Sequence, residues 1–534
     1  MIVHTQQVQS RQLSVSFSTL SQPQVTIIPW QARVSVTCGT EDMVSRSGVG
    51  VVWFRGNDLR VLDHPALRAC HAKHDAVLHV FCWDEQWTRA RSRFGCRRMG
   101  VLRARFLREG FLDLSRSLES KKSTLVVRYG DPVKDLAAIV KTLGCTAVHT
   151  IAGICDEELR LEESVRKALK VPLERYHSNT LVDLDQLGFD PMETPDVFTH
   201  FRKLVERNVV FRHPAGEPLI WKKDVSDQVG RDPLPEVLEM FEDLSESEMK
   251  SLGRETPFHG GESFAHERMN DYIWSNDCLK SYKETRNGML GMNYSSKFSP
   301  WLAIGCLTSK QVVQQIRLYE SRRIANDSTY WLIFELLWRD FFAFSAMKYG
   351  KRIFLQQGPQ RKSVPWKQDE ALFRQWCEGR TGYPLIDACL RELTATGFMS
   401  NRGRQIVASF LTKDMELDWR MGAEFFEEHL LDYDPCSNYG NWTYVAGVGS
   451  DPREDRYFNI VKQGSMYDPK CEFIRFWCPE ISKLPDDILL NISRLQKQQR
   501  MMFSINFGIW PAVTVPLKFA SFKTTKSSRF SAKK

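Results

Sequence analysis

The chain has 534 residues, too many for one ordinary domain, so we expect two. Hydrophobic residues make up 42% of it, and no apolar run is long enough to span a membrane. The 13 cysteines are odd in number and lack paired spacing, which disfavours a disulfide scaffold or a zinc ribbon and favours reduced thiols inside a cell.

The first 40 residues contain no Asp or Glu and only two arginines, Arg11 and Arg33. This composition fits an organelle transit peptide, for a chloroplast or a mitochondrion, and it also fits a disordered leader. We therefore expect residues 1–45 to be a leader. If they carry no targeting signal, the expected location is the nucleus or the cytoplasm.

Alternating elements predict an α/β domain over residues 46–185. Short apolar, β-branched runs predict strands at 49–54, 77–83, 125–128 and 147–151, and the segments 99–118, 131–143 and 156–170 predict helices. Strand, helix and strand at this spacing predict a Rossmann-like parallel sheet with right-handed crossovers. No G-x-G-x-x-G follows the first strand, so we expect no dinucleotide there.

Later segments differ in composition. Prolines are frequent between 186 and 255, which predicts an irregular linker, and helical periodicity over 256–487 predicts an all-α domain. Nine basic residues and no acidic residue follow Asp487, so we expect 488–534 to be a flexible basic tail. Such a tail adds salt-sensitive affinity for nucleic acid, including RNA, or only solubilises the chain.

Cys70, His71 and His74 have the residue types of a metal site. No second pair with ligand spacing follows them, so a solvated helix face is the preferred interpretation. We therefore predict no metal.

The segment 397–444 combines three kinds of functional group. They are a polar helix face with Asn401 and Arg404, two carboxylates at Asp432 and Asp434, and indoles at Trp419 and Trp442. Basic and amide groups hold phosphates, carboxylates hold ribose hydroxyls or an arginine, and indoles transfer electrons. This combination is typical of a redox flavin site connected to the surface.

The same segment resembles the flavin-binding core of the photolyase/cryptochrome family. The blocks Y-K-E-T-R-N-G-M-L-G-M-N-Y-S-S-K-F-S-P-W at 282–301 and E-L-L-W-R-D-F-F at 335–342 resemble its cryptochrome DASH branch. The resemblance covers about 49–480 and implies an α/β domain followed by an all-α FAD-binding domain in a monomer. One departure is Gly56, an extra residue in W-F-R-G-N-D-L-R, where positive φ could absorb the insertion.

The resemblance implies the FAD contacts. They are Tyr282, Ser295, Ser296, Lys297, Ser299, Arg339, Arg404, Asp432, Asp434 and Asn438. The loop 295–299 precedes a helix, so it suits the diphosphate, with a helix cap as the alternative. We expect Arg404 to pair with Asp432 near the flavin ring. Asn438 would face N5, where a carboxylate would repel reduced flavin.

Three tryptophans match the family's electron-transfer triad, from the flavin to the surface: Trp442, Trp419 and Trp366. Each alone would be a core residue. Together, within V-P-W, L-D-W and G-N-W, they predict photoreduction of FAD.

The resemblance also implies a substrate face for cyclobutane pyrimidine dimers in ultraviolet-damaged DNA. It comprises Glu335, Trp338, Asn401, Arg402, Gln405 and Tyr444. Gln405 and Tyr444 stand where duplex-acting photolyases tend to have Met and Trp. The more polar cavity predicts preference for single-stranded or looped DNA, where base flipping costs little. No paired histidines adjoin Ser400–Arg404, which disfavours (6-4) repair.

The expected activity is light-driven dimer repair. The alternatives are a blue-light photoreceptor or nucleic-acid-binding regulator with little repair, and a light-independent flavoprotein. The branch usually holds methenyltetrahydrofolate as an antenna, and F-L-R-E-G at 106–110 makes Glu109 the candidate contact. An exposed helical Glu is the alternative, and Gly110 departs from the usual Ser.

Overall fold

The computed structural model describes residues 48–450, 456–495, 497–503 and 510–518. The predicted leader, residues 1–45, and the end of the predicted basic tail, residues 519–534, lie outside the described residues.

A parallel sheet forms the N-terminal part, as predicted. Its strands are β1 (Val49–Phe54), β2 (Ala76–Asp84), β3 (Leu125–Gly130), β4 (Ala147–Ile151) and β5 (Leu173–Tyr176), in the order β3-β2-β1-β4-β5. The helices of this part are α1 (Pro65–Lys73), α2 (Gln86–Arg89), α3 (Val101–Glu119), α4 (Pro132–Leu143) and α5 (Asp156–Ala168).

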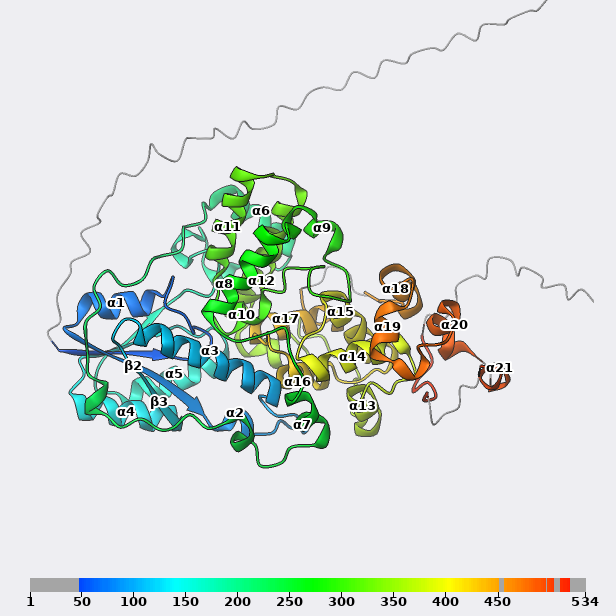
Figure 1. Cartoon of the computed structure of the whole chain (residues 1–534), viewed down its shortest axis with the longest axis horizontal. Coiled ribbons are helices and arrows are strands. Elements are labelled where there is room, and N and C mark those ends of the chain that lie inside the picture. The colour runs from blue at the N-terminus through cyan, green and yellow to red at the C-terminus, as the bar shows by residue number, and fades with distance from the viewer. Residues whose placement is uncertain (1–47, 451–455, 496, 504–509, 519–534) are drawn as a thin grey trace, which may run out of the picture. The chain divides into compact units, whose positions relative to one another are not determined.

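The sheet separates two cores, because successive side chains of a strand point to opposite faces. In β1, Val52 and Phe54 join the core that includes α1 and α3, whereas Val51 and Trp53 join the core that includes α4 and α5. Both faces are therefore covered by helices, as Figure 1 shows for α3 and α4. This doubly covered arrangement explains the continuous apolar runs in the strands.

The α1 helix is not a solvated face, so that interpretation is wrong. Cys70, His71 and His74 are at most 1% exposed. They are buried because α1 packs on β1, β4 and β5, and the side chains of β1 and β4 are almost all buried.

The segment 186–255 is less irregular than its prolines suggested. It contains α6 (Phe198–Asn208), α7 (Glu246–Leu252) and a short strand, β6 (Lys223–Asp224), which pairs with β2. Phe198, Phe201 and Val205 are buried on one side of α6 because that helix packs on a long helix of the C-terminal part. The prolines flank these elements and do not interrupt them.

The C-terminal part is helical, as predicted. Its helices are α8 (Glu262–Asn270), α9 (Tyr282–Thr285), α10 (Ser299–Ala303), α11 (Ser309–Arg322), α12 (Asp327–Tyr349), α13 (Glu370–Cys377), α14 (Pro384–Thr396), α15 (Asn401–Ser409), α16 (Trp419–His429), α17 (Pro435–Ala446), α18 (Ile460–Tyr467) and α19 (Glu472–Trp477). The central helix is α12, which contacts α6, α9, α11 and α17. Asn326 caps it by accepting hydrogen bonds from two backbone N–H groups.

The turn after β1 connects the two parts. Gly56 has a φ of +87°, so the extra residue is accommodated in the left-handed region. The N–H of Leu59 then bonds to the carbonyl of Ile304 at 3.1 Å. A Cβ on Gly305 would lie 2.0 Å from the carbonyl oxygen of Asn57, so the contact requires glycine at 305.

A buried carboxylate makes a second connection to α12. Asp340 accepts hydrogen bonds from the N–H groups of Leu181 and Val182, each at 2.9 Å. Burial raises the pKa of Asp340 to about 7. This carboxyl therefore holds a proton more tightly in the folded chain than it would in water.

Residues 488–518 do not form a flexible arm where they are described, so that part of the tail prediction is wrong. They include the end of α20 (Asp486–Asn491) and α21 (Lys497–Met502). Trp510 is fully buried, and its indole donates to the carbonyl of Gly382 at 3.3 Å. The N–H of Lys518 bonds to Asp414 at 3.0 Å. Apolar residues between the basic ones explain this packing.

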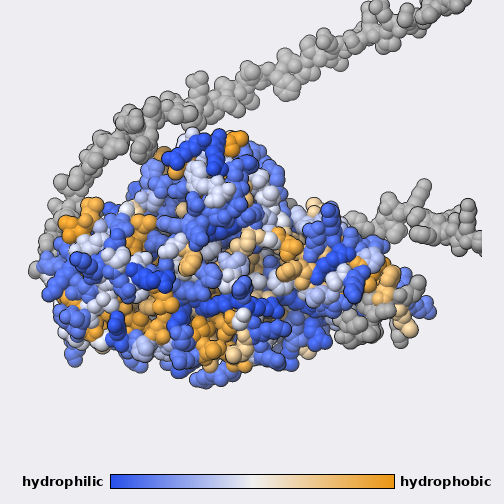
Figure 2. All heavy atoms as spheres, viewed as in Figure 1, coloured by the Kyte–Doolittle hydropathy of each residue, from blue (hydrophilic) through white to orange (hydrophobic). Residues whose placement is uncertain are grey.

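Hydrophobic residues on the face drawn in Figure 2 gather in separate patches on a mostly hydrophilic surface. No helix among the described residues is both long and apolar enough to cross a membrane.

Candidate functional site

An arginine–aspartate pair lies at the centre of the predicted flavin site. Arg404 of α15 donates two hydrogen bonds to Asp432, at 3.0 and 2.8 Å, as expected from the sequence. Ser299, at the start of α10, donates to the same carboxylate at 2.6 Å. Because the Asp432 side chain is only 3% exposed, this bidentate pair fixes three elements against one another.

The loop before α10 has a cation that suits a phosphate. Lys297 is buried, and its ammonium lies 4.4 Å from the ring centroid of Tyr294 and 4.5 Å from that of Phe398. Within the described part of the chain, it has no hydrogen bond or ion pair. Arg268 braces the loop by donating to the carbonyls of Ser295 and Ser296.

Two buried polar atoms next to this loop also fit a ligand. The hydroxyl of Tyr294 and Oε2 of Glu392 have no hydrogen-bond partner among the described residues. Burial raises the pKa of Glu392 and lowers that of Lys297. A cation and polar atoms left without partners in a dry site are the features expected where a polar cofactor such as FAD binds.

The start of α17 contributes two further predicted contacts. Asp434 caps this helix by accepting from the N–H of Ser437, and it lies 3.5 Å from the guanidinium of Arg339. Asn438 is buried one turn later, and its amide donates to the carbonyl of Ala423 at 2.9 Å. That bond fixes the orientation of the amide, which leaves its oxygen available.

Glu335 of α12 lies in a mixed polar and aromatic environment. It accepts from Arg286, just after α9, and from the indole N–H of Trp331 at 3.1 Å. Burial raises the pKa of Glu335, although the Arg286 charge and the Trp331 hydrogen bond oppose this rise. Tyr282 is buried close to Glu335 and Arg286, and burial raises its pKa too.

Trp338 belongs to an aromatic group that joins three helices. Its ring stacks on Phe198 of α6, with centroids 3.7 Å apart and planes at 11°, and it meets Tyr444 of α17 edge-on at 5.9 Å. The hydroxyl of Tyr444 accepts from Arg456 at 2.9 Å. The indole is therefore held in one orientation by packing.

Arg402 organises the polar edge of the predicted substrate face. It donates to Gln405 at 2.8 Å and to Asn287 at 3.1 Å, and it lies 4.6 Å from the ring centroid of Tyr467. Asn401, at the first position of α15, is exposed. The structure thus brings Arg402 and Gln405 together through a direct contact, while Asn401 remains accessible.

The three predicted electron-transfer residues lie on connected elements. Trp442 and Trp419 are 2% and 0% exposed on the packed helices α17 and α16, and Trp366 is partly exposed. The backbone of Lys367 forms hydrogen bonds with the backbone of Glu416 and Asp418. Trp366 and Trp419 each lie next to this β-bridge, one on either of the two paired segments. Exposure therefore increases at the residue predicted to be outermost.

Glu109 of α3 forms polar contacts at the junction between the α/β part and the helical part. Its Oε2 accepts from the N–H of Gly260 at 2.8 Å and lies 3.8 Å from His259. The neighbouring Gly110 has a packing reason, because a Cβ there would lie 2.9 Å from Ile304.

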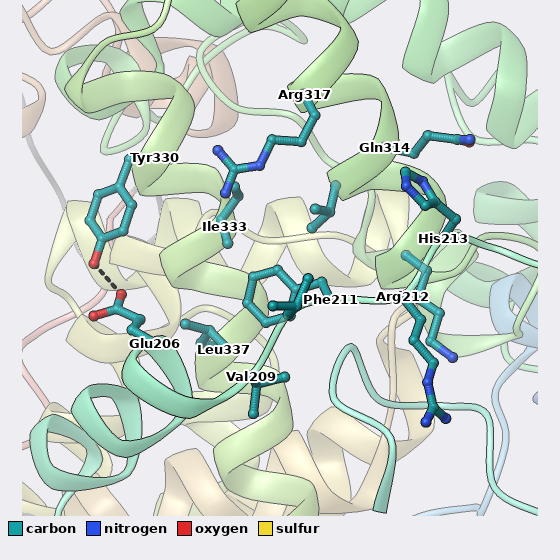
Figure 3. Close-up of a pocket in the computed structure, with 13 residues that line it drawn as sticks. Glu206, Val209, Phe211, Arg212, His213, Gln314, Arg317, Tyr330, Ile333 and Leu337 are labelled. Atoms are coloured by element: carbon teal, nitrogen blue, oxygen red, sulfur yellow. Dashed lines mark hydrogen bonds between the residues drawn. The ribbon is translucent and has the colours of Figure 1, made fainter. Parts of the chain in front are cut away.

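A separate hollow of about 530 Å³ lies next to α12, on the side of that helix that carries Ile333 and Leu337. Figure 3 shows Phe211 near the centre, below Ile333 and above Leu337 and Val209, with Arg317 and Tyr330 in the upper part of the view. Ile333 and Leu337 share this face of α12, whereas Glu335 and Arg339 project from the opposite side by helical geometry. No predicted site residue lines this hollow.

Several contacts of the site were not predicted. They are Phe198, Arg268, Arg286, Asn287 and Glu392. Arg286 and Asn287 stand inside the block Y-K-E-T-R-N, so a charged residue one helical turn after Tyr282 was an available signal. Phe198 had none, because its segment was interpreted as a linker.

Comparison with known proteins agrees with this arrangement. Residues 50–218 match the DNA photolyase family and residues 331–527 match the FAD binding domain of DNA photolyase. The chain is 46% identical to cryptochrome DASH, chloroplastic/mitochondrial, of Arabidopsis thaliana over 446 residues, which is 82% of this chain and 77% of that protein.

Solved structures give the same result. A Synechocystis cryptochrome superposes with a TM-score of 0.82 at 40% identity, over 88% of this chain and 97% of that one. A class III photolyase from Agrobacterium tumefaciens gives 0.74 at 25% identity, over 88% and 95%. The chain therefore belongs to the photolyase/cryptochrome family, and within it to cryptochrome DASH.

Proposed function

We propose that this FAD-binding family member repairs cyclobutane pyrimidine dimers in single-stranded or looped DNA under blue light. The observation that carries the proposal is Glu335, a carboxyl with a raised pKa beside the fixed ring of Trp338. In its protonated form, such a carboxyl donates a hydrogen bond to a dimer carbonyl and stabilises negative charge that develops there. Trp338 presents a flat apolar surface to the bases.

Residues of the flavin site take the following roles in this proposal. Lys297, Ser295, Ser296 and Tyr282 hold the diphosphate region. The Arg404–Asp432 pair, supported by Ser299, orients the ring side, while Asp434 with Arg339 takes part of the adenosine or ribose. Asn438 offers its amide to N5. FAD, when bound, reduced and excited by light, would supply the electron that splits the dimer and would take it back afterwards. Trp442, Trp419 and Trp366 would carry charge between this site and solvent.

The polar edge supports a preference for single strands. Gln405 is bonded to Arg402, and Tyr444 to Arg456, so neither side chain presents an apolar wall. Flipping a dimer out of a duplex costs a few kcal/mol, which such a cavity recovers poorly. Arg402 and the exposed Asn401 would contact the backbone and the dimer of a strand that is already unpaired.

The decisive experiment uses the protein purified in darkness and reduced under blue light. Dimers remaining in ultraviolet-damaged single-stranded and duplex DNA are then counted. We expect rapid loss from single strands and little from duplex. If FAD is photoreduced normally and dimers persist in both substrates, repair is excluded and a photoreceptor or nucleic-acid-binding regulator becomes the better account. Activity that persists in darkness would instead indicate a light-independent flavoprotein.

We also propose that Glu109 contacts a methenyltetrahydrofolate antenna at the junction of the two parts. The proposal is supported by the Glu109 carboxylate, which accepts from the N–H of Gly260 at this junction and lies close to His259. Purified protein should contain folate, and Glu109→Gln should contain less while it retains FAD. Equal folate in both proteins would exclude this role.

Our proposals for location and partners draw on the composition of the terminal segments and on the relatives. The Arabidopsis relative is named chloroplastic/mitochondrial, so we propose that residues 1–45 direct this chain to one of these organelles. A fluorescent fusion with and without that segment tests this.

We expect a monomer by light scattering, and salt-sensitive binding of RNA that weakens when residues 519–534 are removed.

A further inference from the structure

A cluster of metal-ligand side chains lies in the α/β part, outside the flavin and substrate site. Cys70 of α1, His74 just after α1 and His149 of β4 offer one sulfur and two nitrogen atoms that all lie within 4.8 Å of one another. All three residues are at most 1% exposed. One thiol and two imidazoles that converge in this way are the donor types of a metal site.

The two imidazoles are oriented as metal ligands usually are. His74 Nδ1 lies 3.0 Å from the hydroxyl of Thr146, and His149 Nδ1 lies 3.0 Å from the hydroxyl of Tyr176. The outer ring nitrogens are therefore bonded to hydroxyls, and the Nε2 atoms face each other at 2.9 Å. Outer-shell hydrogen bonds of this type fix the ring orientation of metal-binding histidines.

The sheet leaves room for the cluster. A Cβ on Gly50 of β1 would lie 2.4 Å from the His74 ring and 2.6 Å from Cys70 Sγ. Only glycine therefore fits beneath these two ligands.

We propose that Cys70, His74 and His149 bind a zinc ion that joins α1 to β4. One thiolate and two imidazoles are a ligand set that zinc prefers. In a tetrahedral zinc site the two nitrogens stand roughly 3.3 Å apart, so the Nε2 atoms need to separate by only about half an ångström. Because zinc binds the thiolate form of cysteine, binding releases the thiol proton of Cys70 into solvent.

A second histidine pair in the same part of the chain serves as a control for the zinc proposal. His71 and His79 also face each other through Nε2 atoms, 3.1 Å apart, on α1 and β2. Burial lowers the pKa of both to about 3, so both are neutral at neutral pH. No thiol completes a ligand set around them among the described residues, so they form a hydrogen-bonded pair only.

The test measures zinc in the untagged FAD-loaded protein. Metal is removed with a chelator, zinc is added back, and affinity is measured by competition with a chromogenic chelator. We expect one equivalent of zinc for the native chain and for His71→Gln. Affinity should fall tenfold or more for Cys70→Ser and for His149→Gln.

Thermal unfolding gives a second measurement that does not depend on light. Zinc should raise the Tm of the native chain and of His71→Gln but not that of Cys70→Ser, because only a folded site binds it. The proposal is overturned if the native chain takes up no more zinc than Cys70→Ser. Equal loss of binding in His71→Gln and Cys70→Ser overturns it too, since zinc would then bind elsewhere.

Discussion

Arg286 forms an ion pair with Glu335 and connects the end of α9 to the middle of α12. The guanidinium favours the ionised carboxylate, whereas burial favours the neutral acid. The protonation state of Glu335 therefore depends on a residue that does not need to touch the substrate.

Removing that charge should change the pH profile of repair. With Arg286→Ala, the pKa of Glu335 rises further, so the neutral acid persists to higher pH. Repair declines as pH rises through this pKa, and the decline should therefore move to higher pH in the variant. Initial repair rates between about pH 6 and 9 check this. Arg317→Ala, outside the site, is the control, and superimposable profiles for all three proteins would contradict the prediction.

Truncating Glu335 itself should separate repair from photoreduction. Glu335→Ala removes the hydrogen-bond donor, and we expect repair to slow by roughly 10²-fold or more. Glu335→Gln keeps a neutral donor and should retain more activity than Ala. Both variants should bind and photoreduce FAD as the native chain does. Equal repair by Glu335→Ala and the native protein would remove this residue from the mechanism.

Substitutions in the predicted tryptophan chain should slow photoreduction of FAD and leave repair intact. Trp419→Phe replaces an oxidisable indole by a phenyl ring, so photoreduction of oxidised FAD should lose most of its rate, while repair by chemically reduced protein persists. Absorbance under blue light with a reductant measures this. Trp376→Phe is the matched control, because Trp376 is also fully buried, with its ring 6.5 Å from Trp442, but lies outside the predicted chain. Photoreduction that is unchanged in Trp419→Phe would show that charge leaves Trp442 by another route.

The Arg404–Asp432 pair should govern FAD affinity. Asp432→Asn leaves the guanidinium with a neutral partner, and we expect a loss of about 1–3 kcal/mol in FAD binding. Fluorescence of released FAD during dilution gives the dissociation constant. Asp418→Asn breaks a comparable pair with Arg420 elsewhere, so it should lower stability without weakening FAD binding. FAD affinity that is unchanged in Asp432→Asn would exclude the proposed role.

Asp340 should make stability fall as pH rises. Its pKa is about 7 in the folded chain and about 4 when unfolded, so the folded state binds more protons between these values. Stability from this group is therefore lost as pH rises from about 4 to 7, by at most about 4 kcal/mol. Asp340→Asn has no titrating carboxyl at this position, so its stability does not fall for this reason. The difference between the Tm of the variant and the Tm of the native chain should therefore increase as pH rises from about 4 to 7. A difference that is constant with pH would contradict the shift.

The sheet and the helical part could be predicted because their patterns are local. The runs at β1 to β4 alternate with amphipathic helices, and their register follows from parallel pairing. The Arg404–Asp432 pair was also predicted, because both residues stand inside one recognisable motif. Contacts between distant segments had no such signal.

The errors have a common physical origin. Phe198 stacks on Trp338 although prolines surround α6, and Cys70 is buried although polar residues adjoin it. Composition reports how a segment would behave alone, whereas burial is decided by what packs against it. For the same reason, the convergence of Cys70 with His149 depends on α1 crossing β4, which no local pattern indicates.

Trp510 has a practical consequence for work with shortened chains. A boundary chosen from charge would remove everything after residue 487, including this fully buried indole and the bond from Tyr383 to Val515. Loss of a buried tryptophan typically costs 3–5 kcal/mol, so about that much stability is at risk. Shortened proteins should therefore end after Lys518, and a fusion partner added there begins next to Glu416, which Lys518 and Lys367 both contact.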